Sequence, residues 1–174
     1  QPLLHQYNGE YYPGIMKSNY VISEDGLTME CEIFDYVYDS AGNHLTVDDV
    51  IFSLNEAFKV WPEILDTVQD IVKTGDYTFN FIFTRALYVA ELDTITRQFI
   101  VTEAAYTSSP DEMHTTPVGT GPYVLTSYTS GYSMTYEKRD DFWQYDATQV
   151  YARDMANVQT LNYYVIAESA QRTI

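Results

Sequence analysis

Alternating apolar and polar residues predict most of the strands in this chain. In the stretch 27–34 every second residue is apolar, and these residues would share one face: Leu27, Met29, Cys31 and Ile33. The stretch 77–83 places three phenylalanines on one face: Phe79, Phe81 and Phe83. Similar patterns predict further strands at 20–23, 68–72, 97–101, 123–128, 133–137 and 158–166.

A helical period replaces this alternation between residues 47 and 60. Apolar residues recur there at steps of three and four: Val47, Val50, Ile51, Leu54 and Phe58. Thr46 suits the N-cap, and Asp48 and Asp49 suit the positive end of the helix dipole. The stretch 47–60 is therefore predicted to be an amphipathic helix.

Turn-forming residues separate these elements. Asn8-Gly9 marks a turn near the start, and Trp61-Pro62 ends the first helix, with Pro62 able to begin a short helical turn that reaches Thr67. The remaining segments are assigned from their composition: a helix at 86–94, a loop at 103–116, a long connection at 144–155 and the beginning of a helix at 168–172.

A constrained turn precedes the predicted hairpin of residues 123–137. It reads Pro117-Val118-Gly119-Thr120-Gly121-Pro122-Tyr123. Glycine allows positive φ, whereas proline fixes φ and lacks a backbone donor, so this composition predicts a defined backbone rather than a flexible linker. Ser130-Gly131 supplies the hairpin turn, and the hairpin ends at Arg139-Asp140-Asp141-Phe142-Trp143.

These segments resemble the substrate-binding proteins of ABC importers, in the family whose best-known members capture oligopeptides, dipeptides and nickel. The turn and the hairpin end are one match. A second match lies upstream and in the right order, at Ser23-Glu24-Asp25-Gly26-Leu27-Thr28 and at Gly42-Asn43-His44-Leu45-Thr46-Val47-Asp48-Asp49-Val50-Ile51-Phe52-Ser53-Leu54. The chain departs from the family at 35–40, where a basic residue is usual and this sequence has none.

The resemblance implies a mixed α/β fold of the type II periplasmic-binding-protein class. Residues 1–46 would supply strands of lobe I, residues 47–116 an inserted α+β subdomain, and residues 117–174 a return to lobe I. The 174 residues would then be an excised segment, with the second ligand-binding lobe and the export signal outside it. We expect such a segment to fold but to hold ligand weakly.

The resemblance also implies a non-catalytic function. The protein would capture peptides or a similar small solute outside the membrane, close two lobes around it and deliver it to ABC permease subunits, as a monomer. Its location would be extracytoplasmic, either as a bacterial cell-surface lipoprotein or in the periplasm. Neither a cofactor nor a metal is expected.

Two residues are candidates for ligand contact. Trp61 follows the first helix near the place where some relatives carry a ligand-facing aromatic residue, although a core position is an equal alternative. Arg97 would meet a ligand carboxylate through its guanidinium, with an exposed surface position as the alternative. Gly119, Thr120, Gly121, Pro122, Tyr123 and Trp143 are assigned to the structural motif rather than to the ligand.

Charge and composition exclude several classes of protein. The chain has 9 Lys and Arg against 25 Asp and Glu, a formal net charge of −16, which disfavours binding to nucleic acid and to anionic membranes. Its 17 Tyr and 8 Phe argue for a packed core rather than disorder. The single cysteine, Cys31, excludes an internal disulfide and is interpreted as a small buried residue.

Two rival functions stay open at the level of sequence. A hydrolase would use paired carboxylates, for which Asp49 and Asp141 are the candidates. A sensor would keep the binding fold without a transporter. A metal site formed by the three histidines, His5, His44 and His114, would require residues from separate segments to meet.

Overall fold

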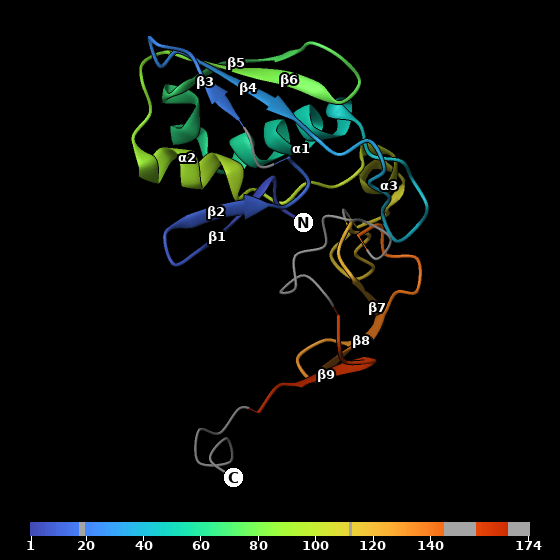
Figure 1. Ribbon diagram of the computed structural model, residues 1–174. Helices are drawn as coiled ribbons and strands as arrows, with labels where there is room; N and C mark the ends of the chain where they lie inside the picture. The colour runs from blue at the N-terminus through green and yellow to red at the C-terminus, as the bar shows by residue number, and fades with distance from the viewer. Residues whose placement is uncertain (18–19, 112, 145–155, 167–174) are drawn as a thin grey trace.

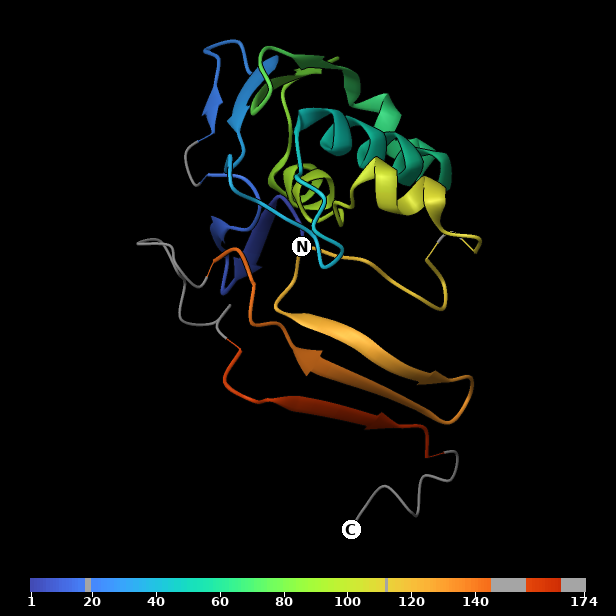
Figure 2. The ribbon, with the colours of Figure 1, turned by 90° about the vertical axis from the view of Figure 1, so that its right-hand side faces the viewer.

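The computed structural model describes residues 1–17, 20–111, 113–144 and 156–166. A four-stranded sheet lies over helices α1 and α2, the β1–β2 hairpin lies on the other side of these helices, and a three-stranded sheet extends away from this body (Figure 1). Figure 2 shows β7, β8 and β9 side by side in this extension. The architecture is mixed α/β, as the sequence predicted.

The elements in chain order begin with β1 (Leu4–Tyr7), β2 (Glu10–Pro13), β3 (Val21–Ile22), β4 (Thr28–Glu32), α1 (Val47–Val60), the 3₁₀ helix η1 (Pro62–Asp66), β5 (Val68–Lys73) and β6 (Thr78–Phe83). They continue with α2 (Val89–Thr96), α3 (Glu103–Ser108), β7 (Tyr123–Thr129), β8 (Ser133–Lys138) and β9 (Thr160–Tyr164). The predicted long connection and the predicted helix at 168–172 lie in residues 145–155 and 167–174, outside the described residues.

The four-stranded sheet has the order β3-β4-β6-β5 with antiparallel neighbours. The predicted Leu27 lies before β4 and is 37% exposed, but the other alternating residues lie on the core face, where Cys31 lies opposite Phe79 and Met29 opposite Phe81. All four side chains are buried. Burial raises the pKa of the Cys31 thiol, which keeps it in the neutral form that suits a core residue.

This sheet joins segments that the sequence assigned to different parts of the fold. Strand β4 belongs to the predicted lobe I segment 1–46, and its partner β6 belongs to the predicted subdomain 47–116. The two segments also share one hydrophobic core. The division at residue 46 therefore passes through a continuous sheet.

Helix α1 has the predicted bounds and the predicted buried face. Val47, Val50, Leu54 and Phe58 are buried beneath the sheet. Asp49 Oδ2 accepts a hydrogen bond of 2.8 Å from the Thr46 backbone N–H, the reciprocal contact of a capping box. A local sequence signal thus fixes where this helix begins.

Two predictions after α2 were wrong, because tertiary contacts replace the expected local structure. The stretch 97–101 is not a strand: its pairing is an isolated bridge between Pro2 and Phe99. Ser53 Oγ donates to the carbonyl oxygen of Val101 and accepts from its N–H, so these backbone groups are satisfied without a neighbouring strand.

The predicted loop 103–116 contains α3, whose first N–H donates to Asp49 Oδ1 at 2.9 Å. The helix predicted at 86–94 begins and ends later, at Val89–Thr96.

The extension is an antiparallel sheet of order β7-β8-β9. Its pairing places Leu125 opposite Tyr136 and Tyr136 opposite Leu161, so these apolar residues share one face. An irregularity between Leu125 and Ser127 keeps Tyr128 opposite Met134. The predicted hairpin and the predicted last strand are both confirmed.

Arg139 holds the turn before β7 in place. Its side chain is buried, and it donates to the carbonyl oxygens of Gly119 at 3.3 Å, Gly121 at 3.2 Å and Asp39 at 2.8 Å. Its Nε bonds Asp141 Oδ1 at 3.0 Å. Five guanidinium donors in a fixed plane suit this set of acceptors. Arg139 therefore fixes the backbone of this turn at Gly119 and Gly121.

Candidate ligand-binding cavity

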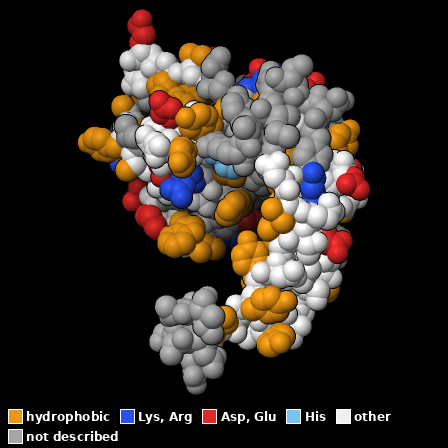
Figure 3. Space-filling view, turned by 60° about the horizontal axis from the view of Figure 1, so that its bottom comes forward, with side chains coloured by type: hydrophobic (Ala, Val, Ile, Leu, Met, Phe, Trp, Pro, Cys, Tyr) orange, Lys and Arg blue, Asp and Glu red, His pale blue; other side chains and the backbone are white. Residues whose placement is uncertain are grey.

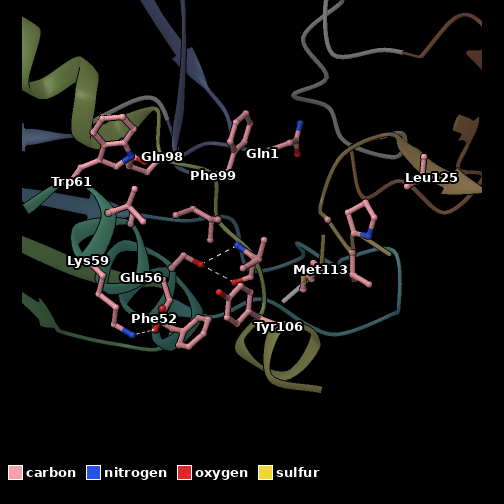
Figure 4. Close-up of a pocket in the computed structure, with 18 of the residues that line it drawn as sticks. Gln1, Phe52, Glu56, Lys59, Trp61, Gln98, Phe99, Tyr106, Met113 and Leu125 are labelled. Carbon is pink, nitrogen blue, oxygen red and sulfur yellow. Dashed lines mark hydrogen bonds and ion pairs between the residues drawn. The ribbon is translucent and has the colours of Figure 1, made fainter. Parts of the chain in front are cut away.

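A cavity of about 1000 Å³ lies between α1, the segment 98–101, α3 and the β7–β8 hairpin. Six aromatic residues line it: Phe52, Trp61, Phe99, Tyr106, Tyr123 and Tyr136. Figure 4 shows Trp61, Gln98 and Phe99 together on one side and Phe52 beside Tyr106 on another. Small-molecule sites are concave and mostly apolar, with few polar groups, and this cavity has that character.

The cavity is continuous with the apolar face of the extension. Tyr123 and Tyr136 line the main cavity and also a second hollow of about 320 Å³, which Met134, Leu161 and Tyr163 complete. Hydrophobic side chains are visible along the extension and the adjoining body (Figure 3). An apolar surface thus runs from α1 to β9.

Trp61 lies at the cavity, at the C-terminal end of α1. Its backbone N–H bonds the carbonyl of Ala57 at 2.9 Å, and 53% of the residue is exposed. Pro62 follows and prevents the helix from continuing. The core position that the sequence left open for Trp61 is therefore wrong, and the side chain is accessible to a ligand.

Arg97 ends α2 near the cavity but is not among its lining residues. Its side chain is 59% exposed and forms an ion pair of 3.0 Å with Asp93, one helical turn earlier. The lining begins with the next residue, Gln98. The structure thus places Trp61 in the cavity wall and Arg97 on the surface beside it.

Two of the remaining motif residues, Thr120 and Trp143, contact each other. Thr120 is fully buried, and its carbonyl accepts a 2.8 Å hydrogen bond from the indole N–H of Trp143, which also donates to the Gln1 side chain at 3.1 Å. Tyr123 donates its hydroxyl to the carbonyl of Val158 at 2.7 Å while its ring lines the cavity. Tyr123 therefore serves both the sheet and the cavity wall.

The two motif glycines do not use positive φ, contrary to the expectation from sequence. The glycines with positive φ among the described residues are Gly9, Gly26, Gly42 and Gly131. A Cβ at Gly119 or at Gly121 would meet nothing within 4 Å. Neither local strain nor close packing within the described chain therefore requires glycine at these two positions.

Sequence reasoning missed Arg139 and the buried carboxylate near it. Asp39 is fully buried, and its carboxylate accepts from Thr102 Oγ1 at 2.6 Å, from Asn43 Nδ2 at 2.8 Å and from two backbone N–H groups of the 39–43 turn. The sequence signal for this buried carboxylate was the Asp-x-x-Gly-Asn turn at 39–43, which begins in the segment 35–40 where the family's usual basic residue is absent. Only the fold shows that Thr102, 63 residues later, completes it.

The rival carboxylates lie in structural hydrogen bonds. Asp49 caps α1 and receives the first N–H of α3, and Asp141 binds Arg139, which lowers the pKa of the Asp141 carboxyl. Neither residue lines the aromatic cavity. Within the described residues, no three His, Cys, Asp or Glu side chains are grouped so as to hold a metal.

Comparison with solved structures defines the fold. The fold resembles a dipeptide-binding protein from Pseudoalteromonas sp. SM9913 in complex with Met-Leu, with a TM-score of 0.79 and 18% identity over 98% of this chain and 38% of that chain. It also resembles NikZ from Campylobacter jejuni in complex with Ni(L-His), with a TM-score of 0.70 and 22% identity over 82% of this chain and 30% of that chain. The described fold is that of type II periplasmic binding proteins.

The family follows from the sequence match. Residues 10–174 match the model of the bacterial extracellular solute-binding proteins, family 5 middle region, and the chain belongs to this family. A curated relative, the probable peptide-binding protein YejA of Agrobacterium fabrum, is 28% identical over 140 residues, which cover 73% of this chain and 22% of the relative. The resemblance inferred from the turn and hairpin motifs is thereby confirmed.

The chain spans between about a fifth and two fifths of the length of these relatives. No helix among the described residues has both the length and the apolar character needed to cross a membrane.

Proposed function

We propose that this chain is part of the solute-capturing component of an ABC importer, which takes up peptides or a similar small solute outside the membrane and delivers it to the permease. The observation that carries the proposal is the aromatic cavity of about 1000 Å³ in a chain of this family. The protein binds its solute without chemical change and works as an extracytoplasmic monomer, held in the periplasm or by a lipid anchor.

The proposed binding mode uses two lobes. Residues 1–46 and 117–174 are assigned to lobe I, and residues 47–116 to a subdomain that shares the β4–β6 sheet and the hydrophobic core with residues 1–46. A second lobe from the rest of the polypeptide closes over the cavity. Closure stabilises the bound form through contacts that the open form lacks. The exposed rings of Trp61 and Phe99, 53% and 75% accessible, are the surface that closure would cover.

The proposed ligand contacts are Trp61 and Arg97. Trp61 offers a flat apolar face in the cavity wall. Arg97 becomes available to a ligand carboxylate when that carboxylate replaces Asp93, because exposed ion pairs of this kind are held by at most about 1 kcal/mol.

Native mass spectrometry tests the proposal. The polypeptide as its gene encodes it is mixed with a peptide digest, with the 174-residue chain as the comparison. Retention of a peptide mass by the encoded polypeptide supports peptide capture. Failure to retain any mass from peptide, sugar and metal-chelate mixtures contradicts the proposed function.

A further inference from the structure

Most lysines and arginines of the described chain form ion pairs with its own carboxylates. Six lysines and arginines form ion pairs with Asp or Glu: Lys17, Lys59, Lys73, Arg85, Arg97 and Arg139. The sequence has 25 acidic residues against 9 basic ones. The field around such a protein attracts cations and repels anions.

The cavity wall holds one charged side chain of each sign. Its charged residues are Glu56 and Lys59, which lie on α1 and form an ion pair of 2.5 Å. The Lys59 side chain is 68% exposed, whereas that of Glu56 is 31% exposed. Glu56 is thus the more enclosed partner of this ion pair, which a dashed line marks in Figure 4.

Aromatic residues line the same cavity as this carboxylate. Phe52 lies one turn before Glu56 on α1 and contacts Tyr106 edge to face, with ring centroids 5.4 Å apart and an interplanar angle of 65°. Trp61 and Phe99 add two exposed rings to the same cavity. The faces of such rings attract cations as well as apolar groups.

We propose that this cavity selects solutes that combine an apolar or aromatic group with a cationic amine or guanidinium group, and that Glu56 is the residue that accepts the cation. The rings contact the apolar part of the solute. The cation displaces Lys59, a flexible surface partner, and gains a carboxylate in a less hydrated place. The cationic side chain of the described cavity wall, Lys59, is paired with Glu56.

This inference rests on the proposed function, and a matched series of dipeptides tests it. Phe-Lys, Phe-Gln and Phe-Glu share an aromatic residue and differ by one unit of side-chain charge at each step. Isothermal titration calorimetry on the encoded polypeptide should give an affinity for Phe-Lys about tenfold above that for Phe-Glu, with Phe-Gln between them.

Two variants separate Glu56 from the general charge of the protein. Glu56→Gln should reduce the preference for Phe-Lys over Phe-Glu to about twofold or threefold, the part due to the overall field. Glu32→Gln is the matched control, because it removes the same charge outside this cavity. Glu32 forms an ion pair with Lys17 at the same distance of 2.5 Å. This variant should leave the preference unchanged.

A third variant tests the displacement of Lys59. Lys59→Met frees Glu56 and should strengthen binding of Phe-Lys about threefold. Equal affinities for Phe-Lys and Phe-Glu, equal effects of the Glu56 and Glu32 changes, or no binding of any of the three dipeptides would overturn the proposed selectivity. If mass spectrometry still detects a retained solute in those cases, solute capture stands and the charge selectivity alone fails.

Discussion

The guanidinium of Arg139 donates a hydrogen bond of 2.8 Å to the carbonyl oxygen of Asp39, 100 residues earlier in the chain. The same side chain binds the carbonyls of Gly119 and Gly121. One buried cation therefore ties the turn before β7, which leads into the cavity wall, to the turn before α1. The first prediction follows from this arrangement.

Replacing Arg139 with methionine should destabilise the protein by about 2–4 kcal/mol, because the buried carbonyl oxygens lose a charged donor that no apolar side chain replaces. Chemical unfolding followed by circular dichroism measures the change. Asp141→Asn is the control: its side chain is 71% exposed, so its loss should cost less than about 1 kcal/mol. Similar losses in the two variants would show that the ion pair, not the carbonyl contacts, carries the effect.

The two tryptophans should separate binding from stability. Trp61→Ala should weaken solute binding about tenfold and change the unfolding free energy by less than about 0.5 kcal/mol, because this side chain lies in an exposed cavity wall. Trp143→Phe should do the reverse and cost about 1–3 kcal/mol, because it leaves the Thr120 carbonyl without its indole donor. Calorimetric binding and thermal unfolding of both variants test the pair. Loss of binding only in the Trp143 variant would contradict the assignment of Trp61.

Glu91 should make stability depend on pH below about 4.5. Its hydrogen bonds with Arg85, then with the Tyr88 N–H, lower its pKa from 4.5 to about 2 in the folded protein. Because the folded pKa is the lower one, the stabilising contribution is complete above pH 4.5 and is lost as the pH falls toward 2. Unfolding measured at steps from pH 7 to pH 2 should show a shallower fall in Glu91→Gln.

Arg85→Gln offers an independent check, because Arg85 is the largest cause of the shift in the Glu91 pKa. It should remove most of the same pH dependence while leaving the carboxylate in place. Parallel stability curves for the unaltered protein and for both variants would contradict the assignment.

The stability cost of replacing a glycine with alanine should depend on the room available for the added Cβ, and not on whether the glycine belongs to the family motif. At Gly14 an added Cβ would lie 2.2 Å from the carbonyl oxygen of Pro2, so Gly14→Ala should cost about 1–3 kcal/mol. At Gly119 a Cβ meets nothing within 4 Å, so Gly119→Ala should leave stability unchanged within about 0.5 kcal/mol. Thermal unfolding of the two variants compares them. A large loss at Gly119 would indicate a backbone requirement that its surroundings do not show.

Much of the fold followed from local pattern. The alternation around Met29 and Cys31 predicted β4, and the helical period with the Thr46 cap predicted α1 with its bounds. The turn and hairpin motif from Pro117 to Trp143 was enough to indicate the family, which the match over residues 10–174 confirmed. These features are local because burial of one face leaves a period of two or of about 3.6 residues in the sequence.

The tertiary structure decided the features that depend on distant segments. Asp49 begins α3 at Glu103, and Ser53 satisfies the backbone of Val101, so a predicted loop contains a helix and a predicted strand is absent. Of the two residues that the sequence offered for ligand contact, Trp61 lies in the cavity wall while Arg97 pairs with Asp93 on the surface.

The sequence by itself determined most of the strands, helix α1 with its buried face, and the family to which the chain belongs. Only the tertiary structure brought Phe52, Phe99 and Tyr136 to one cavity and placed Arg139 against Asp39. The physical reason is that a hydrophobic period records burial of a residue but not the identity of its partner. A hydrogen bond across 100 residues leaves no period in the sequence, because it depends on how the elements are packed together.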